Sequence, residues 1–290
     1  MSGSDKKLRG SLFLLLAAMI WGCAFTAQSV ASDSVGPWTF NGIRFLLAGI
    51  EILILERPLA RLLMLPKTRN RTPLKPGILC GVILITASVL QQAGIRWTTA
   101  GKAGFITSLY VVLVPVFSAL FLRRRQSVHI WISAILAASA LFLLSGAEAD
   151  TIAKGDFLEL LCAAAFAVHI LFIDRVSPGV DPIRFSAVQF LTAGILGTAG
   201  AAAFETIDFT GIQRALVPIL YAGLLSAEAG YTLQVLGQKD ADPAVASVLL
   251  SLESVFSAVF GFLLLHETLS VRELIGCAVM FAAVLLAQKE

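Results

Sequence analysis

Charged side chains are scarce in this 290-residue chain. Asp, Glu, Lys and Arg make up 14% of the sequence, whereas a soluble globular domain carries about a quarter. Hydrophobic residues reach 57%, and the mean hydropathy is +0.85. This composition excludes a soluble globular domain and indicates an integral membrane protein.

Long polar segments are also missing. Apolar stretches of the length that a bilayer requires, about 17 to 25 residues, account for most of the chain. The loops between them leave no room for a soluble catalytic domain, and we expect the first stretch to be a retained span, not a cleaved signal peptide. The ten predicted membrane spans are residues 11–30, 38–55, 77–96, 103–122, 128–145, 157–176, 183–203, 215–236, 243–265 and 271–287.

Motifs for catalysis, metal binding and nucleic-acid binding are absent from the sequence. The four cysteines, Cys23, Cys80, Cys162 and Cys277, lie inside predicted spans without metal-ligand spacing, and a thiol there behaves as a small apolar side chain. No Gly-x-Ser-x-Gly element is present. The net charge of +3 requires no polyanionic partner. We therefore predict no catalytic residue, no metal, no cofactor and no nucleic acid.

Lysine and arginine are distributed unevenly between the predicted loops. With the N-terminus placed in the cytoplasm, 16 of the 22 lie on the cytoplasmic side, five lie outside, and Arg44 lies within a span. Positive residues accumulate on the cytoplasmic side of membrane proteins. The sequence therefore predicts that both termini are cytoplasmic.

The two halves of the chain repeat one another. At an offset of 145 residues, the stretch from Pro37 to Gly49 matches the stretch from Pro182 to Gly194 at six of thirteen positions. Each half then holds five predicted spans, an odd number, so the second half enters the membrane from the opposite side. Such inverted repeats are typical of secondary transporters; a duplication retained only for packing is the alternative. We place the two repeats at residues 8–146 and 155–288.

Several segments also carry a family resemblance. They are WGCAFTAQ (21–28), GPWTFNGIRFLLAG (36–49), the stretch 90–120, GYTLQVLGQ (230–238), SLESVFSAVFGFLLLHETLS (251–270) and IGCAVMFAAVLLA (275–287). In order and spacing they resemble the EamA branch of the drug/metabolite transporter (DMT) superfamily. The resemblance implies ten helices in two EamA units, a plasma-membrane location (the bacterial inner membrane), and movement of small metabolites, often amino acids, usually outward. The sequence departs from the family pattern where Ser254 replaces a proline after Glu253, and where His266 and Glu267 stand for Gly-Glu.

Arg44 lies near the middle of the second predicted span, with Asn41 and Glu51 on the same helical face. A charged side chain at the bilayer centre costs about 2.5 to 3.5 kcal/mol, so it needs an interior partner or a watery cavity. Arg44 either holds a substrate carboxylate or tunes a nearby acid, or it pairs with Glu51 or Glu253 to fix the helix packing. The sequence leaves both interpretations open.

Two carboxylates, Glu228 and Glu253, lie near the middles of the eighth and ninth predicted spans. A carboxylate withdrawn from water favours its protonated form and releases the proton when it is rehydrated. Both are candidates for coupling transport to protons; a buried acid held by hydrogen bonds for packing is the alternative. Glu228, Tyr231 and Gln234 recur every three residues, and we expect them to share a face that lines a cavity.

The sixth predicted span places Glu159, Cys162, Phe166 and His169 along one face. His169 is a candidate for substrate binding or proton relay because imidazole titrates near neutrality, and a satisfied interior histidine is the alternative. Glu159 lies near the outer boundary, where we expect the headgroup region to wet it.

Uncharged donors complete the candidate substrate site. Amides and aromatic rings suit a small zwitterionic or heterocyclic solute, and hydrogen bonding between helices is the alternative. The candidates, with those above, are Trp21, Gln28, Asn41, Arg44, Gln91, Gln92, Tyr110, His169, Gln189, Tyr231 and Gln234.

The sequence therefore predicts an all-α polytopic membrane protein and a secondary transporter. The leading hypothesis is a proton-coupled or gradient-driven exporter of small metabolites, working by alternating access as a monomer or weak homodimer in the lipid bilayer. A polytopic membrane enzyme or sensor is the competing class. Within transport, a passive facilitator and a lipid-linked sugar flippase stay open.

Overall fold

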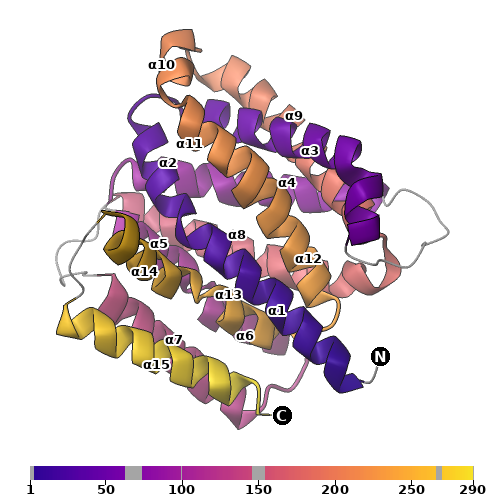
Figure 1. Ribbon diagram of the computed structural model, residues 1–290, viewed down its shortest axis with the longest axis vertical. Coiled ribbons are helices and arrows are strands. Elements are labelled where there is room, and N and C mark those ends of the chain that lie inside the picture. The colour runs from indigo at the N-terminus through magenta and orange to yellow at the C-terminus, as the bar shows by residue number, and fades with distance from the viewer. Residues whose placement is uncertain (1–2, 63–73, 99, 146–153, 266–269, 290) are drawn as a thin grey trace.

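The computed structural model describes residues 3–62, 74–98, 100–145, 154–265 and 270–289, and this part of the chain contains helices and no strand (Figure 1). His266 and Glu267, the residues of the family departure, lie outside the described residues. An all-helical chain is what the bilayer demands, because a lipid-exposed backbone must satisfy its polar groups internally.

Eight helical stretches among the described residues are long and apolar enough to cross a membrane. They correspond to eight of the ten ranges expected from the sequence. The other two ranges contain α7 (Val128–Leu144) and α15 (Val271–Ala287), which are 17 residues each. These two helices pack side by side along one edge of the molecule (Figure 1).

Three of the spans are interrupted near their middles. The first consists of α1 (Gly3–Gly22) and α2 (Ala24–Ser32), separated at Cys23. The fourth consists of α5 (Ala100–Ser108) and α6 (Tyr110–Phe121), separated at Leu109. The ninth consists of α13 (Pro243–Leu250) and α14 (Glu253–Leu265), separated at residues 251–252. Broken helices inside membranes line cavities or sites, because their freed backbone groups need partners.

The eighth span changes its helical geometry along its length. It runs from α11 (Leu216–Leu220) through η2 (Tyr221–Tyr231), a π-helix, into α12 (Thr232–Gln238). A π-helix bonds residue i to i+5 instead of i+4, so it turns side chains onto other faces than an α-helix would.

Side chains cap the N-termini of several helices. Asp181 accepts hydrogen bonds from the backbone of Ile183 and Arg184 at the start of α9 (Pro182–Phe204), and Asp242 accepts from Ala244 at the start of α13. Ser270 and Glu273 form a capping box at the start of α15. Asp208 caps the short α10 (Phe209–Arg214) in the same way. These caps satisfy backbone N–H groups that the helix itself leaves free.

The core is built where helices from the two halves of the chain meet. Helix α3 (Pro37–Leu62) packs along α9, and α4 (Leu74–Ile95) packs against α8 (Lys154–Val176) and α9. The rings of Phe45 and Phe190 lie 6.3 Å apart at this junction with an interplanar angle of 12°. A turn of 3-10 helix, η1 (Ser177–Gly179), joins α8 to α9.

Two glycines let α3 and α9 approach closely. A methyl group on Gly194 would lie 2.6 Å from the backbone nitrogen of Leu46, and one on Gly49 would lie 3.0 Å from that of Leu191. Small residues permit such contacts between membrane helices. The two contacts are reciprocal, because Gly49 and Gly194, like Leu46 and Leu191, are 145 positions apart.

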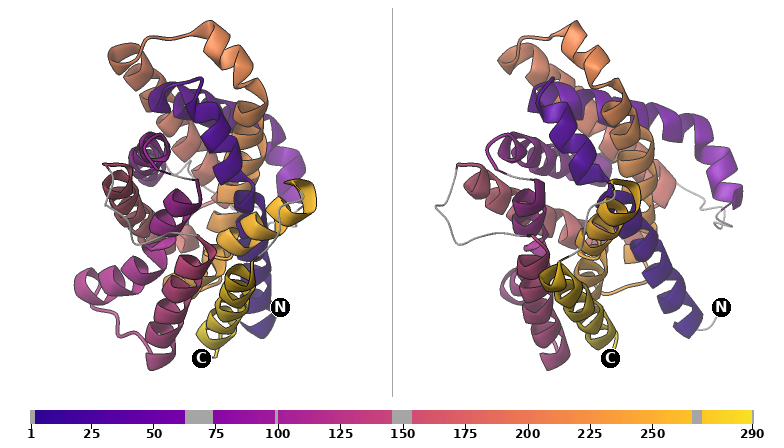
Figure 2. Two further views of the ribbon diagram at one scale, coloured as in Figure 1. Left: turned by 90° about the vertical axis from the view of Figure 1, so that its left-hand side faces the viewer. Right: turned by 60° about the vertical axis from the view of Figure 1, so that its left-hand side comes forward.

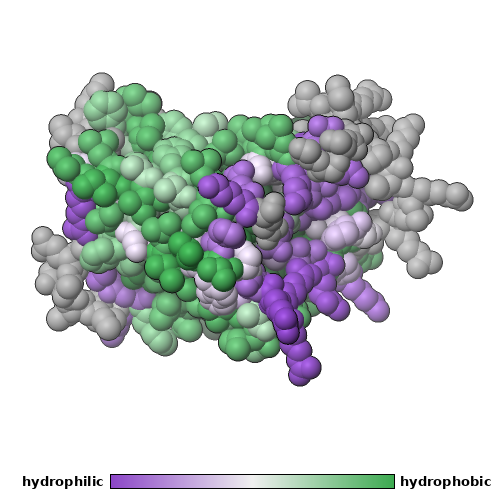
Figure 3. Space-filling model, turned by 90° about the horizontal axis from the view of Figure 1, so that it is seen from below, coloured by the Kyte–Doolittle hydropathy of each residue, from purple (hydrophilic) through white to green (hydrophobic). Residues whose placement is uncertain are grey.

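The outer surface carries many large apolar side chains, including Leu12, Ile54, Phe121, Phe204 and Leu285, each at least half exposed. In a soluble protein such a surface would aggregate; in this chain it faces lipid. Figure 3 shows hydrophobic side chains over much of the face seen from below, with hydrophilic side chains gathered on one part of it. Helix α1 begins and α15 ends at the same end of the molecule (Figures 1 and 2).

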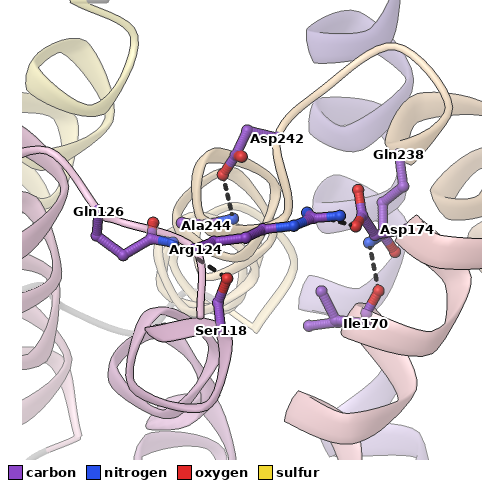
Figure 4. A network of polar contacts seen from close by, with 8 residues as sticks. All are labelled: Ser118, Arg124, Gln126, Ile170, Asp174, Gln238, Asp242 and Ala244. Carbon is purple, nitrogen blue, oxygen red and sulfur yellow. Dashed lines mark hydrogen bonds and ion pairs between the residues drawn. The ribbon is translucent and has the colours of Figure 1, made fainter. Parts of the chain in front are cut away.

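A polar network ties the two halves together near the C-terminal end of α6 (Figure 4). Arg124 Nη1 lies 2.7 Å from Asp174 Oδ2 on α8, and Gln238 Nε2 donates to the backbone oxygen of Ile170 at 2.9 Å. Between Arg124 and α6, Arg123 takes a φ of 53°. That left-handed residue ends the helix and lets the Arg124 N–H reach the Ser118 carbonyl at 3.2 Å.

Candidate functional site

A cavity of about 40 Å³ lies at the level of the three helix interruptions. Trp21 and Ala24 flank the first, Thr107 and Tyr110 the second, and Leu250 and Glu253 the third, and all six line the cavity. A water needs at least about 10–15 Å³ of such space, so this conformation has room for only a few waters. The cavity is therefore narrow in this conformation.

Most of the polar residues expected in the substrate site line this cavity. The residues of the sequence prediction found there are Trp21, Gln28, Arg44, Gln91, Tyr110, Tyr231, Gln234 and Glu253. Their positions in the chain extend from the first span to the ninth, so only the tertiary fold brings them together. The sequence reasoning missed Thr107 and Ser226 as lining residues, because small hydroxyl side chains are common in membrane helices and carry no distinctive signal.

The guanidinium group of Arg44 has no counter-ion among the residues that the structure describes. The side chain is 2% exposed, and Nε and Nη2 have no hydrogen-bond partner among the described residues. The Phe40 and Phe45 rings pack against it, with their centroids 5.4 and 4.6 Å from the guanidinium carbon. The pairing with Glu51 or Glu253 that the sequence allowed is not found in the described part of the chain. Arg44 therefore presents a positive charge to the cavity with donors still free.

The carboxylate of Glu253 is held by two hydroxyls from the opposite half of the chain. Its Oε1 accepts hydrogen bonds from Ser108 Oγ at 3.0 Å and from Tyr110 Oη at 3.1 Å. The two donors stand on either side of the interruption at Leu109, and Glu253 itself is the first residue of α14. The side chain is 5% exposed. The cavity thus contains a cation and a carboxyl group that are not paired with each other.

Aromatic rings form one wall of the cavity. Trp21 and Tyr231 lie 4.8 Å apart between ring centroids, and Trp21 Nε1 donates to the backbone oxygen of Ser226 at 2.9 Å. Phe25 and Phe166 also line the space. Such rings offer flat apolar surface to a bound solute, and the indole is fixed in orientation by its hydrogen bond.

Four of the expected substrate ligands lie outside the cavity lining and make hydrogen bonds within the protein. Asn41 donates to the backbone oxygens of Pro37 and Ser88 at 2.8 and 3.1 Å. Gln92 donates to the backbone oxygen of Gln28 at 2.9 Å. His169 Nε2 lies 3.3 Å from Gln189 Oε1. These contacts agree with the alternative given in the sequence analysis, in which such residues form hydrogen bonds between helices instead of binding substrate.

The structure does not bring Glu228 to the cavity with Tyr231 and Gln234. The residues of this span that line the cavity are Ser226, Tyr231 and Gln234. Ser226 and Tyr231 are five positions apart within η2, the spacing that a π-helix places on one face. The α-helical periodicity assumed from the sequence is therefore wrong here, and Glu228 points elsewhere, within electrostatic range of Glu51.

Glu159 is completely buried, contrary to the expectation that headgroups wet it. Its Oε2 accepts a hydrogen bond of 2.6 Å from Thr107 Oγ1, and its Oε1 has no hydrogen-bond partner in the described part of the chain. Helix α4 covers this oxygen, with Gly94 packed directly against it. The neighbouring Thr107 lines the cavity, so Glu159 lies one side chain behind the cavity wall.

Comparison with known protein families identifies the family of this chain. The model of the EamA-like transporter family matches residues 8–146 and 153–288. The chain belongs to the EamA-like transporter family. This confirms the resemblance inferred from the sequence.

Relatives of this EamA-like protein are named as transporters. An uncharacterized transporter of Archaeoglobus fulgidus is 31% identical over 281 residues, covering 97% of this chain and 86% of the relative. The uncharacterized inner membrane transporter YedA of Escherichia coli K12 is 26% identical over 283 residues, covering 96% of this chain and 90% of YedA. A solved crystal structure superimposes with a TM-score of 0.79 at 19% identity over 96% of each chain; that likeness shows the fold alone.

The family and the apolar helices together define the general role of the chain. It is a membrane transporter of the drug/metabolite type and a multi-pass protein of the plasma membrane. Its substrate is a small molecule and its surroundings are lipid. The names of the family and of its relatives indicate transport.

Proposed function

We propose that this EamA-like protein exports small zwitterionic metabolites, amino acids or related compounds, by proton-coupled alternating access. The observation that carries the proposal is the cavity that holds an unpaired guanidinium and a hydrogen-bonded carboxyl group. Arg44 offers free N–H donors to a substrate carboxylate. Glu253, with the oxygen of Tyr110 beside it, offers acceptors to a substrate ammonium group.

Proton coupling follows from the position of Glu253 in this scheme. A carboxyl group with little access to water favours its neutral form, and contact with water favours ionisation. If ammonium binding and protonation compete for the same carboxylate, the substrate and the proton occupy the site in turn. Alternation of the two in the outward- and inward-open conformations couples export of the metabolite to entry of protons.

We infer that ten spans form two inverted repeats, residues 8–146 and 155–288, with both termini in the cytoplasm. Several helix contacts support this, since they occur in related pairs: α4 packs on α8 as α12 packs on α1, and α3 and α9 pack on each other, as do α7 and α15. The reciprocal glycine contacts between α3 and α9 support a twofold axis at that junction. Two units of opposite orientation give inward- and outward-open states of similar energy.

The cavity volume supports a cycle in which the site opens and closes. A space of about 40 Å³ does not admit an amino acid, so binding requires helices to move apart at one end. The interruptions at Cys23, Leu109 and residues 251–252 are natural places for that motion, because the half-helices on either side can move separately.

Counterflow in reconstituted liposomes tests the proposal. Liposomes loaded with one amino acid should accumulate the same labelled amino acid from outside, and a pH gradient should shift the accumulation in the sense of antiport. Accumulation that does not change with the pH gradient would favour a passive facilitator over a proton-coupled exporter. Exchange of lipid-linked sugars with no amino-acid exchange would favour a flippase, and absence of any exchange by folded protein would overturn the proposal.

A further inference from the structure

Glu159 is a buried acid that the proposed substrate site does not use. It lies on α8, is 0% exposed, and has one oxygen that finds no hydrogen-bond partner within the described ranges. An ionised carboxylate buried without a cation is very costly. No ion pair with Glu159 is present among the described residues. A role in packing would be served better by an amide or an apolar side chain.

The donor that holds Glu159 adjoins the donor that holds Glu253. Thr107 Oγ1 donates to Glu159 Oε2 at 2.6 Å, and Ser108 Oγ donates to Glu253 Oε1 at 3.0 Å. These are consecutive residues, the last two of α5 before its interruption at Leu109. Thr107 and Glu253 both line the cavity. The end of one half-helix therefore links two buried carboxyl groups from two other helices, α8 and α14.

Beyond Glu159, polar groups continue to the membrane face at which α5 and α8 begin. Asp156 lies one helical turn before Glu159 and within electrostatic range of it. Its carboxylate lies 2.7 Å from Lys102 Nζ and accepts a hydrogen bond of 3.0 Å from Thr98 Oγ1. The titratable and charged groups around Glu159 are thus Asp156 and Cys162 on α8 and Lys102 on α5, while α4 contributes Gly94.

We propose that Glu159 is a second proton carrier, which passes protons between Glu253 in the cavity and Asp156 at that membrane face. This inference rests on the proposed proton coupling and adds its route. Water admitted to the cavity takes the proton from the Glu253 carboxyl group and gives one to the Thr107 hydroxyl oxygen. The Thr107 proton then moves along the hydrogen bond to Glu159 Oε2 as the proton that Glu159 already holds passes on to Asp156. One proton leaves Glu253, Glu159 gains one and loses one, and one arrives at Asp156, so only O–H bonds change.

Infrared spectroscopy of the purified protein tests, without any transport, whether Glu159 is protonated. The difference spectrum between wild type and Glu159→Gln at neutral pH should contain the carbonyl band of a protonated carboxyl group. Thr107→Val should shift that band, because the donor to Oε2 is removed. If the band is missing, Glu159 is ionised at neutral pH and the proposal is wrong.

Transport assays in proteoliposomes test whether Glu159 carries protons during coupled transport. Glu159→Gln should lower accumulation driven by a pH gradient by about tenfold or more, and leave substrate self-exchange without a gradient within about twofold of wild type. Thr107→Val should also lower accumulation driven by the pH gradient. This variant replaces Glu159→Gln in the experiment if Glu159→Gln does not fold. Glu273→Gln, at the exposed capping box of α15, is the matched control and should change neither rate.

The outcomes separate this inference from the proposed function. Full gradient-driven accumulation in Glu159→Gln, with loss in Glu253→Gln, overturns the route through Glu159 and keeps the coupling at Glu253. No gradient-driven accumulation in wild type overturns the coupling, and the route with it, whatever the infrared band shows.

Discussion

The hydroxyl of Ser108 donates a hydrogen bond of 3.0 Å to the carboxylate of Glu253, across a sequence separation of 145 residues. Each residue stands at the interruption of its span, one at the end of α5 and the other at the start of α14. The two interruptions therefore meet in space and face the same cavity. A change in the protonation of Glu253 would alter this hydrogen bond directly. Protonation can therefore affect the relative positions of the two half-helices.

Arg44 should determine the preference of the transporter for carboxylate-bearing solutes. Arg44→Ala should weaken binding of such solutes by about tenfold or more, because a hydrogen bond to a charged group contributes about 1.5–3 kcal/mol. Neutral analogues should lose much less. Ligand-induced shifts in melting temperature measure both, with Arg44→Lys as the variant that keeps the charge but not the planar donors. Equal loss for both kinds of solute would show that Arg44 serves packing.

Glu253 and Glu228 should behave differently, although both lie near mid-membrane in the sequence. Glu253→Gln should abolish accumulation driven by a pH gradient and weaken self-exchange without abolishing it. The amide oxygen can still accept hydrogen bonds from Ser108, Tyr110 and a substrate ammonium group, but the amide has no negative charge and no ionisable proton. Glu228→Gln should leave gradient-driven accumulation near the wild-type level, since Glu228 does not line the cavity. Counterflow at several pH values measures both. The reverse result would return the coupling role to Glu228.

The glycines at the α3–α9 junction should be intolerant of a single added methyl group. Gly194→Ala and Gly49→Ala should each lower the stability of the folded protein by about 1–3 kcal/mol, because the methyl group meets backbone on the facing helix. Gly179→Ala is the matched control, since nothing lies within 4 Å of a methyl group at that position. Thermal unfolding in detergent measures all three. Unchanged melting of Gly194→Ala would show that the helices can separate at little cost.

The ion pair between Arg124 and Asp174 should matter more for transport than for stability. The two side chains are 44% and 14% exposed, so breaking the pair should cost no more than about 1 kcal/mol of stability. Because the pair joins the segment after α6 to α8 (Figure 4), Arg124→Ala should ease opening at that end and raise the rate of self-exchange.

A more exposed pair within one short segment provides the control for that experiment. Arg214 lies 3.5 Å from Asp208, and both belong to the region of α10. Arg214→Ala should change neither the exchange rate nor the melting temperature. An exchange rate in Arg124→Ala no higher than in Arg214→Ala would show that the Arg124–Asp174 pair does not restrain opening.

Particular residues show which parts of the fold and site could be predicted. The ranges of the spans and the burial of Arg44 and Glu253 follow from local composition, because a charged group in an apolar run must face the interior. Eight of the thirteen candidate site residues line the cavity. Glu228 was misplaced because its face was assigned with α-helical periodicity, and no local pattern announces that residues 221–231 form a π-helix.

The sequence by itself determined that this protein is an apolar, helical membrane protein of a repeated, EamA-like pattern. Hydrophobicity is a property of each residue and its near neighbours, so spans, polar positions and a fixed offset of 145 can be read along the chain. Only the tertiary structure decided which polar groups meet: that Arg44 has no ion-pair partner in the described part of the chain, that Ser108 and Tyr110 hold Glu253, and that Thr107 holds Glu159. Hydrogen-bond partners on different helices depend on where spans are interrupted and how far each is rotated, and those are outcomes of packing between the two halves.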